Sequence, residues 1–303
     1  MYEELLHKAL AGDTKSIARC ISLIENEAEG FEAILLALPV NSHHKTIGIT
    51  GPPGAGKSTL VDGLIRELVK EQKKVAVLCV DPSSPFNLGA LLGDRVRMSE
   101  WYNHPDVFIR SLATRGSLGG LNPSILEITS LLHACPFDYI IIETVGVGQS
   151  EVEIAGLADV TVVVMVPEGG DEVQTMKAGL MEVADIFVVN KSDRPGADMF
   201  VKNLMLMLGP SFRKNKSEMP VVKTAASQHK GMDDLSQKIK ILLSGTGANK
   251  QKQSQLLAER AWHLIMKKRM KDISKEQLLE QIQLSSSDAS FSLYAFVEKF
   301  AGL

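Results

Sequence analysis

One short glycine-bearing segment constrains the fold of this chain more than any other stretch. Residues 47–50 are apolar or β-branched, and residues 51–56 are rich in glycine and proline. Leu60, Leu64 and Leu68 then recur at helical spacing. This order predicts a strand, a tight loop and a helix. A glycine-rich turn before a surface lysine is the plain alternative, but the flanking patterns favour a phosphate-binding loop.

The loop has the residue types that binding of a triphosphate requires. Backbone N–H groups wrap the phosphates, and glycine leaves room for their approach. Lys57 can reach the outer phosphates, and the helix that begins there adds the positive end of its dipole. The Ser58 hydroxyl can ligate Mg²⁺. The nucleotide-binding residues predicted here are Gly51, Pro52, Pro53, Gly54, Ala55, Gly56, Lys57, Ser58 and Thr59.

The patterns divide the chain into three parts. Residues 1–44 predict an N-terminal helical extension, with a short helix over 31–38, and residues 245–303 predict a C-terminal helical arm. Between them, residues 45–244 alternate strands and helices, and the strands are nearly continuous apolar runs. We therefore predict a doubly wound, mostly parallel α/β domain. Its later strands are expected at residues 74–80, 108–112, 139–143, 160–166, 186–189 and 221–222, with a helix at 123–133.

The segment Asn190-Lys191-Ser192-Asp193 indicates which base the site selects. A carboxylate at Asp193 can accept from the N1–H and the exocyclic amine of guanine, whereas adenine would present it with an acceptor. Lys191 can lay its methylene stem across the base, and Asn190 can tie neighbouring loops together. A helix-capping turn is the alternative, but the position after a phosphate loop favours guanine. The base site is also expected to include Thr224, Ala225 and Ala226.

Acidic residues follow two of the predicted strands. Glu143 ends the strand 139–143, and an acid there in a phosphate-loop protein holds Mg²⁺ while a following glycine, here Gly146, approaches the γ-phosphate. Asp81 and Asp94 are further candidates for the metal or the attacking water, although a lone Asp in a loop is commonly a cap. The predicted catalytic residues are Lys57, Asp81, Asp94, Glu143 and Gly146, and the predicted metal ligands are Ser58, Asp81, Asp94 and Glu143.

Two further features concern the phosphates. Small GTPases usually carry a water-orienting glutamine directly after the glycine, where this chain has Val147, so we expect slow intrinsic hydrolysis. Arg95, Arg97 and Arg115 are candidates to neutralise phosphate charge, beside the more ordinary interpretation as surface arginines.

Composition restricts the partners of the chain. The formal net charge is −3 with interspersed signs, so we expect no nucleic-acid partner. No apolar run approaches a membrane span and residues 1–6 lack signal-peptide features, so we expect a cytoplasmic protein with no membrane partner. Cys20, Cys79 and Cys135 lie in apolar surroundings and are expected to be reduced core thiols.

With both nucleotide motifs in place, the chain resembles the MeaB/ArgK family of GTPases, which are chaperones of adenosylcobalamin-dependent methylmalonyl-CoA mutase and its relatives. The resemblance covers nearly the whole chain. It is carried by residues 51–59, Asp81-Pro82-Ser83-Ser84-Pro85, Ala113-Thr114-Arg115-Gly116-Ser117-Leu118-Gly119-Gly120, Glu143-Thr144-Val145-Gly146-Val147-Gly148-Gln149, Asn190-Lys191-Ser192-Asp193 and Ala258-Glu259-Arg260-Ala261-Trp262.

The resemblance implies a P-loop GTPase of the SIMIBI class that uses Mg²⁺ and converts GTP to GDP. It further implies a homodimer joined through the C-terminal helices, hydrolysis stimulated by the mutase, and control of cofactor loading and protection. Asp81, Asp94 and Glu143 map to the acids around Mg²⁺, and residues 169–177 to a mobile loop that communicates with the mutase. The chain departs from the family at Glu168, where a small residue is usual.

Three alternatives remain open at this point. A nickel-delivering metallochaperone GTPase shares the sheet and motifs but needs His or Cys ligands near the switch loops, and none cluster in the sequence. A partitioning-type ATPase would carry an early lysine in the phosphate loop, where this chain has Pro52. A nucleotide-dependent kinase linked to amino-acid transport, the activity in older family names, would need a place for an acceptor substrate.

Overall fold

The computed structural model describes residues 2–39, 45–82, 98–115, 121–146, 151–168, 183–208, 219–245, 250–285 and 291–301. These residues divide into two compact units, Met1–Gln253 and Ser254–Leu303. The first unit contains the sheet, and the second is helical. Within the described part of the chain, no helix combines the length and apolarity that crossing a bilayer requires.

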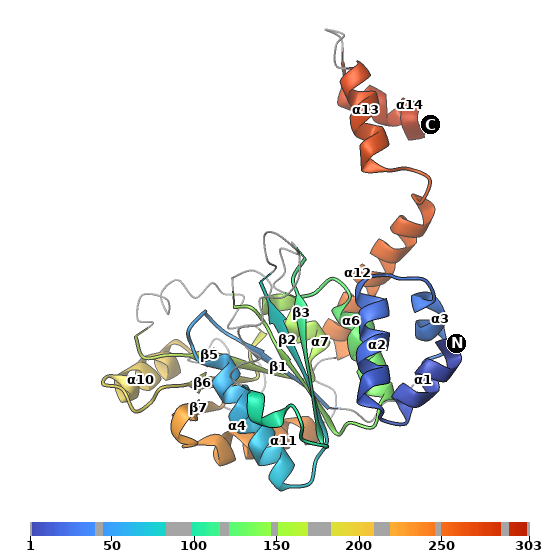
Figure 1. Cartoon of the computed structure of the whole chain (residues 1–303). Helices are drawn as coiled ribbons and strands as arrows, with labels where there is room; N and C mark the ends of the chain where they lie inside the picture. Colours follow the sequence, from blue (N-terminus) through green and yellow to red (C-terminus); the bar gives the residue numbers. More distant parts are fainter. Residues whose placement is uncertain are drawn as a thin grey trace. The chain divides into compact units, whose positions relative to one another are not determined.

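A seven-stranded parallel sheet forms the centre of the first unit (Figure 1). Its order is β3-β2-β4-β1-β5-β6-β7, so β4 is inserted between β1 and β2. The chain thus runs to one side of β1 first and to the other side afterwards, and open α/β sheets bind ligands at such a switch point. The strands are β1 (Lys45–Thr50), β2 (Val75–Asp81), β3 (Val107–Ala113), β4 (Tyr139–Glu143), β5 (Val160–Met165), β6 (Ile186–Val189) and β7 (Val221–Lys223).

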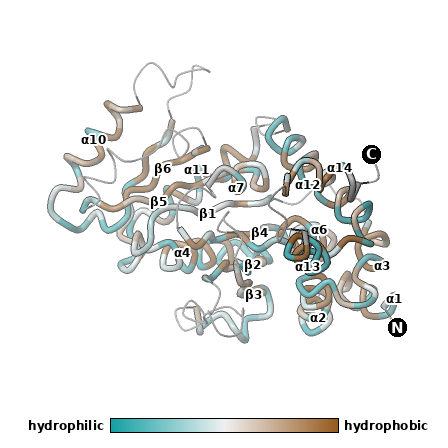
Figure 2. The backbone as a smooth tube through the Cα atoms, turned by 90° about the horizontal axis from the view of Figure 1, so that it is seen from above, coloured by the Kyte–Doolittle hydropathy of each residue, from teal (hydrophilic) through white to brown (hydrophobic). Residues whose placement is uncertain are grey.

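Helices cover both faces of this sheet because its strands are apolar on both sides. Ile47 and Ile49 of β1 pack in one core with α4 (Lys57–Lys70) and α11 (Met232–Ser244). Gly48 between them faces α7 (Glu151–Leu157), where an added Cβ would lie 2.6 Å from Ile154. Phe187 of β6 packs with α10 (Ala197–Met207) on that second face. In Figure 2 the tube is largely brown along β5 and β6, which marks these strands as hydrophobic.

The doubly wound parallel architecture predicted from the sequence is confirmed, with small shifts in element boundaries. The second strand includes Asp81, one residue beyond the prediction. Helix α3 (Phe31–Leu36) ends two residues earlier than expected. Pro39 makes helical backbone unfavourable for the residue before it, so the helix stops before that point. Helix α6 (Ile125–Ala134) begins two residues later than expected, because Asn122 accepts from the Ser124 and Ile125 N–H groups in a preceding turn.

The N-terminal helices α1 (Tyr2–Leu10), α2 (Thr14–Glu25) and α3 form a group in which α2 packs on α6. Asp13 caps α2 by accepting from the Ser16 N–H at 2.8 Å. Cys20 of α2 and Cys135 after α6 are buried free thiols, as expected, and so is Cys79. Burial raises the pKa of Cys20 to about 11 and that of Cys135 to about 12, which makes both thiols poor nucleophiles.

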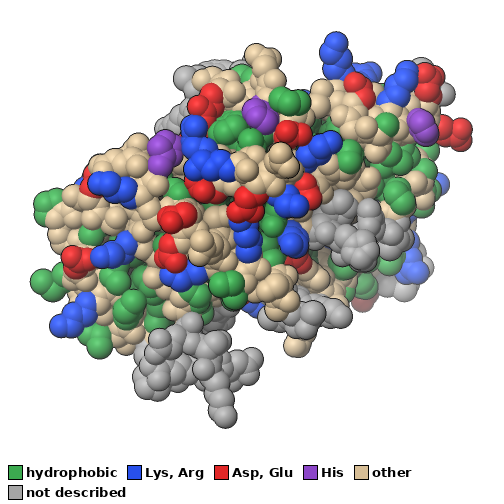
Figure 3. Space-filling view, turned by 90° about the horizontal axis from the view of Figure 1, so that it is seen from below, with side chains coloured by type: hydrophobic (Ala, Val, Ile, Leu, Met, Phe, Trp, Pro, Cys, Tyr) green, Lys and Arg blue, Asp and Glu red, His purple; other side chains and the backbone are tan. Residues whose placement is uncertain are grey.

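Charged side chains of both signs are interspersed over the face drawn in Figure 3. Several form ion pairs along α4 and α11, such as Lys70 with Glu67 at 2.6 Å and Lys238 with Asp234 at 2.7 Å. Such exposed pairs contribute at most about 1 kcal/mol each. The described residues of the first unit also include two short helices, η1 (Ser99–Trp101) before β3 and η3 (Ala226–Gln228) after β7.

The C-terminal residues are helical, as the sequence patterns predict. The elements are α12 (Lys250–Arg269), α13 (Lys275–Ser285) and α14 (Leu293–Ala301). Many of their large apolar side chains are exposed, which is unusual for so many in one small unit. They include Leu257, Trp262, Ile265, Leu279, Leu284, Leu293, Tyr294 and Val297.

Candidate functional site

The loop between β1 and α4 has a backbone that requires glycine. Gly51, Gly54 and Gly56 have φ angles of 139°, 76° and 85°, all in a region that side chains disfavour. A Cβ on Gly51 would lie 2.1 Å from the Val164 carbonyl oxygen of β5. The loop therefore turns tightly against the neighbouring strand at the switch point of the sheet.

Lys57 lies at the start of α4 and is almost fully buried, with 6% of its surface exposed. Its Nζ donates to the carbonyl oxygens of Gly51 at 2.8 Å and Pro52 at 3.1 Å. Gly146, after β4, closes over the same ammonium group, because a Cβ there would lie 2.4 Å from Nζ. The lysine charge is thus held beside the loop by two backbone carbonyl dipoles.

Buried side chains that carry oxygen atoms lie at the carboxyl ends of β2 and β4 and at the start of α4. Ser58 Oγ donates to Glu143 Oε1 at 2.7 Å, and both residues are buried. Asp81, the last residue of β2, is also buried, and β2 pairs directly with β4. Three of the four predicted metal ligands therefore lie at the ends of two adjacent strands or in the first turn of α4. The fourth, Asp94, lies outside the described residues.

Asn190, directly after β6, joins the phosphate loop to the loop after β7. Its Nδ2 donates to the Ala55 carbonyl oxygen at 2.9 Å. Its Oδ1 accepts from Thr224 Oγ1 at 3.0 Å and from the Ala226 N–H at 3.1 Å. An Asn amide can serve both roles at once because it carries a donor and an acceptor. All three loops therefore depend on one side chain that is 2% exposed.

Lys191 and Asp193 continue from Asn190 along the same edge. Lys191 has a φ of 55°, and its Nζ donates to the Gly54 carbonyl oxygen at 2.8 Å. Asp193 is exposed and accepts at Oδ2 from Gln228 Nε2 at 3.2 Å. The motif predicted for guanine thus lies next to the phosphate loop and presents its carboxylate to solvent.

Several predicted residues lie elsewhere or outside the described residues. Arg115 extends to the end of α2, where its Nη2 donates to Asn26 Oδ1 at 2.7 Å. Arg95, Arg97, Val147 and the loop 169–177 lie outside the described residues. Glu168, which precedes that loop, pairs with Arg194, and this hydrogen bond lowers the pKa of the Glu168 carboxyl.

Sequence analysis assigned no role to two residues that contact the site. Thr144 Oγ1 donates to Thr50 Oγ1 at 2.9 Å, which ties the end of β4 to the end of β1. Gln228 reaches Asp193 from η3. Thr144 directly follows Glu143 and was recoverable from its place in the motif, whereas nothing in the sequence around Gln228 indicates its contact.

A parallel sheet with a phosphate loop at its central strand, and an Asn-Lys-Ser-Asp segment hydrogen-bonded to that loop, defines a P-loop GTPase. A family model described as "Methylmalonyl Co-A mutase-associated GTPase MeaB" matches residues 17–278. The chain therefore belongs to the MeaB family of GTPases, which confirms the resemblance inferred from its motifs.

Individual relatives agree with this assignment. A Pyrococcus abyssi protein named as a GTPase is 50% identical over 244 residues, covering 79% of this chain and 75% of that protein. The "Fused isobutyryl-CoA mutase" of Geobacillus kaustophilus is 40% identical over 237 residues, which cover 74% of this chain and 22% of that protein. The solved structure of a LAO/AO transport system kinase superposes with a TM-score of 0.69 at 26% identity, covering 99% of this chain and 96% of that chain.

Proposed function

We propose that this GTPase binds guanine nucleotide with its phosphates in the loop 51–56 and its base on the Asn190 to Asp193 segment. The supporting observation is the pair of hydrogen bonds from Asn190 to Ala55 and from Lys191 to Gly54, which hold the two segments together. Asp193 accepts from the N1–H and exocyclic amine of guanine, and Lys191 covers the face of the base. Thr224, Ala225 and Ala226 line the base from the loop after β7, and Pro52, Pro53 and Thr59 complete the phosphate cradle.

The phosphate end of the site uses Lys57 and Gly146. The Lys57 ammonium exchanges its two carbonyl contacts for oxygens of the outer phosphates, which are stronger acceptors because they are charged. The Gly146 N–H approaches the γ-phosphate, since its lack of a Cβ permits contact with the loop. Both residues stabilise negative charge where it accumulates during phosphoryl transfer.

The same edge fits Mg²⁺. Ser58, Asp81 and Glu143 offer hydroxyl and carboxylate oxygens, the ligand type that Mg²⁺ prefers, and all three are buried. When bound, the ion neutralises charge on the phosphate oxygens. Ser58 and Glu143 are already aligned through their 2.7 Å hydrogen bond. Asp94, which lies outside the described residues, is the fourth proposed ligand.

We further propose that the client is an adenosylcobalamin-dependent acyl-CoA mutase, methylmalonyl-CoA mutase or a relative, whose cofactor loading and protection the nucleotide state gates. The supporting observation is the Geobacillus kaustophilus protein named a fused isobutyryl-CoA mutase, which contains a segment 40% identical to this chain. A GTPase and a mutase joined in one polypeptide act at high effective concentration, which favours partners that work together.

A single-turnover measurement of GTP hydrolysis tests the client. The isolated protein should hydrolyse GTP at well below about one per second, and an acyl-CoA mutase should accelerate it by at least about tenfold, as partners that complete a GTPase site do. A mutase of unrelated cofactor class is the control. If no cobalamin-dependent acyl-CoA mutase binds the protein in either nucleotide state or accelerates its GTP hydrolysis, the client assignment is wrong. The assignment of GTPase activity would still stand.

A kinase is the second candidate, favoured by the likeness over 99% of this chain to the structure titled LAO/AO transport system kinase. The two functions differ in the fate of the γ-phosphate. With γ-labelled GTP, a GTPase releases all of the label as inorganic phosphate. Stable transfer of label to an amino-acid-binding protein would instead establish the kinase.

A further inference from the structure

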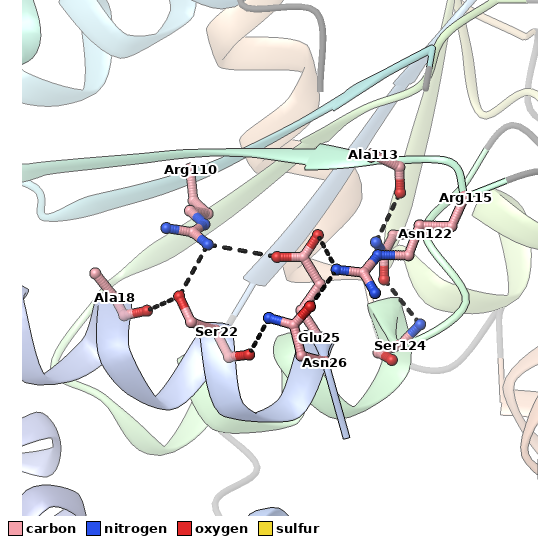
Figure 4. A network of polar contacts seen from close by, with 9 residues as sticks. All are labelled: Ala18, Ser22, Glu25, Asn26, Arg110, Ala113, Arg115, Asn122 and Ser124. Atoms are coloured by element: carbon pink, nitrogen blue, oxygen red, sulfur yellow. Dashed lines mark hydrogen bonds and ion pairs between the residues drawn. The ribbon is translucent and has the colours of Figure 1, made fainter. Parts of the chain in front are cut away.

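The end of helix α2 is attached to the edge strand β3 and to the turn after it by a polar network (Figure 4). Glu25 Oε2 lies 3.4 Å from Arg110 Nη2, and Glu25 Oε1 lies 3.4 Å from Arg115 Nη2. The same Arg115 nitrogen donates to Asn26 Oδ1 at 2.7 Å, and Arg110 Nη2 donates to Ser22 Oγ at 3.1 Å. One carboxylate therefore holds two guanidinium groups from a different part of the chain.

The two guanidinium groups of the network lie at the end of a helix that attracts positive charge. Glu25 is the last residue of α2, and Asn26 is its C-cap. The carbonyl end of a helix carries partial negative charge, so it attracts both arginines in addition to the carboxylate. The Glu25 side chain is only 9% exposed, and Arg110 and Arg115 are 24% and 34% exposed. Solvent screens these contacts less than it screens fully exposed pairs.

The turn that Arg115 belongs to contacts the candidate metal ligand Asp81. The Thr114 N–H donates to the Asp81 carbonyl oxygen at 3.1 Å, at the point where β3 and β2 stop pairing. Asn122 Nδ2 holds the preceding carbonyl, that of Ala113, at 2.7 Å. Arg115 itself has a φ of 49°, a conformation that a residue with a side chain adopts only when its surroundings hold it.

We propose that Glu25 is a positioning residue for the nucleotide site: by holding Arg115 on α2, it fixes the turn whose Thr114 N–H orients Asp81. The inference rests on the proposed role of Asp81 as a ligand of Mg²⁺. The proposal makes helix α2 part of the GTPase site, because α2 supplies the Glu25 carboxylate. In this proposal the Arg115 side chain binds the end of α2 and does not contact phosphate.

The primary variant is Glu25→Gln, which keeps the shape of the side chain and removes its charge. Without the charge Arg115 keeps its hydrogen bond to Asn26 but loses the ion pair with Glu25, so the turn opens more often. In the nucleotide-free protein, the Thr114 amide should exchange with solvent at least about tenfold faster, a loss that corresponds to about 1.4 kcal/mol. The Thr46 amide, which Asp159 Oδ2 holds at 2.8 Å elsewhere in the sheet, should keep its exchange rate.

The second measurement is the Mg²⁺ concentration that half-maximally slows release of a fluorescent GDP. Glu25→Gln should raise this concentration by about three- to tenfold, because Asp81 is less often in place. GDP affinity in EDTA should stay within about twofold, since no phosphate or base contact changes. Arg115→Lys keeps the charge and loses the planar fork, so it should behave like Glu25→Gln. Glu4→Gln, which breaks an exposed pair with Lys8 in α1, is the matched control.

The outcomes separate this inference from the function on which it rests. If folded Glu25→Gln and Arg115→Lys proteins both keep the wild-type Thr114 exchange rate and Mg²⁺ requirement, the inference is overturned. Faster Thr114 exchange with an unchanged Mg²⁺ requirement also overturns it, because the network would then be purely structural. If GDP release from the wild type itself does not respond to Mg²⁺, the proposed metal site fails instead.

Discussion

Single side chains decide how the parts of the nucleotide site meet. Asn190 joins its own loop to two others through hydrogen bonds to Ala55, Thr224 and Ala226. Next to it, the carboxylate of Asp193 is left facing solvent with one contact from Gln228 among the described hydrogen bonds. The buried amide connects the loops rigidly, and the exposed carboxylate is the group that we propose for base recognition.

The first prediction concerns base selectivity. Asp193→Asn should weaken GDP binding by about 100-fold and improve xanthosine diphosphate, because the amide NH₂ opposes the guanine donors but matches the xanthine oxygen. Wild-type protein should bind GDP at least about 100-fold more tightly than ADP. Titration calorimetry with the three nucleotides measures these ratios, and equal wild-type affinities for GDP and ADP would end the guanine assignment.

The second prediction uses two glycines with the same backbone angle. Gly146 and Gly196 both have φ of 85°, so alanine strains each backbone by about 1–2 kcal/mol. An added Cβ at Gly196 meets nothing within 4 Å, whereas at Gly146 it lies 2.3 Å from the Gly51 carbonyl oxygen. Gly146→Ala should therefore lower the rate of GTP hydrolysis by at least about tenfold, and Gly196→Ala should leave it unchanged.

Chemical denaturation and single-turnover kinetics on both variants separate strain from collision. Similar losses of stability with different hydrolysis rates support the close approach of Gly146 to the phosphate loop. Equal rates in the two variants would show that the Gly146 turn has no part in hydrolysis.

At the scale of the elements, the same aspartate hydrogen-bonding pattern recurs at the start of several strands. Asp138, Asp159 and Asp185 each precede a strand, and each accepts from an N–H at the start of a neighbouring strand. In each case the backbone N–H of the aspartate also donates to the carbonyl of the residue that it caps. The first N–H of a parallel strand otherwise lacks a partner inside the sheet, so these pairs fix where the strands begin.

The third prediction is a pH dependence at one of these aspartates. Burial raises the pKa of Asp185 above its ordinary value. The folded protein thus binds this proton more tightly than the unfolded chain, and the stability associated with it is lost as pH rises from about 4 through the raised pKa. Asp185→Asn keeps an oxygen for the Thr161 N–H, so its free energy of unfolding relative to wild type should be higher at pH 7 than at pH 4.

Asp198 supplies a control of opposite sign. The hydrogen bond from Lys223 lowers the pKa of the Asp198 carboxyl, so any stability it contributes is present at neutral pH and is lost as pH falls. Guanidinium unfolding measures the free energy of unfolding at both pH values. Relative to wild type, this free energy should increase with pH for Asp185→Asn and should not increase for Asp198→Asn. An Asp185→Asn difference that is the same at pH 4 and pH 7 would contradict the pKa direction.

At the scale of the whole molecule, the C-terminal helices α12, α13 and α14 are notable for their large apolar side chains. Trp262 is 64% exposed and Tyr294 is 85% exposed, and several Leu, Ile and Val side chains share this exposure. We propose that these helices form the arm of a homodimer, because exposed apolar surface of this kind marks an interaction site.

The fourth prediction follows from that proposal. Light scattering of the full chain should give the mass of two copies, and Trp262→Glu should shift it to one, since a buried charge without a partner is strongly unfavourable. Gln255→Glu adds the same charge at another exposed position of α12 and should leave the dimer intact. A monomeric wild type across micromolar concentrations would contradict the proposed arm.

The sequence by itself determined the features that depend on local spacing. Glycines in residues 51–56, the strand before them and the leucines after them predict the phosphate loop because backbone angles and helical period are local properties. The same holds for the acid at Glu143 and for the guanine segment at Asn190, and the family follows from these motifs taken together. The roles of the individual site residues stay predictions.

Only the tertiary structure decided how these segments meet. The insertion of β4 between β1 and β2 puts Glu143 beside Ser58 across 85 residues, and Asn190 reaches Ala55 across 135. The sequence left Arg115 as a candidate for phosphate, but packing of α2 near β3 turned it toward Glu25 and Asn26 instead. Spacing along a chain reports the period of one element, whereas these contacts arise from the order in which separate elements pack, which no local pattern encodes.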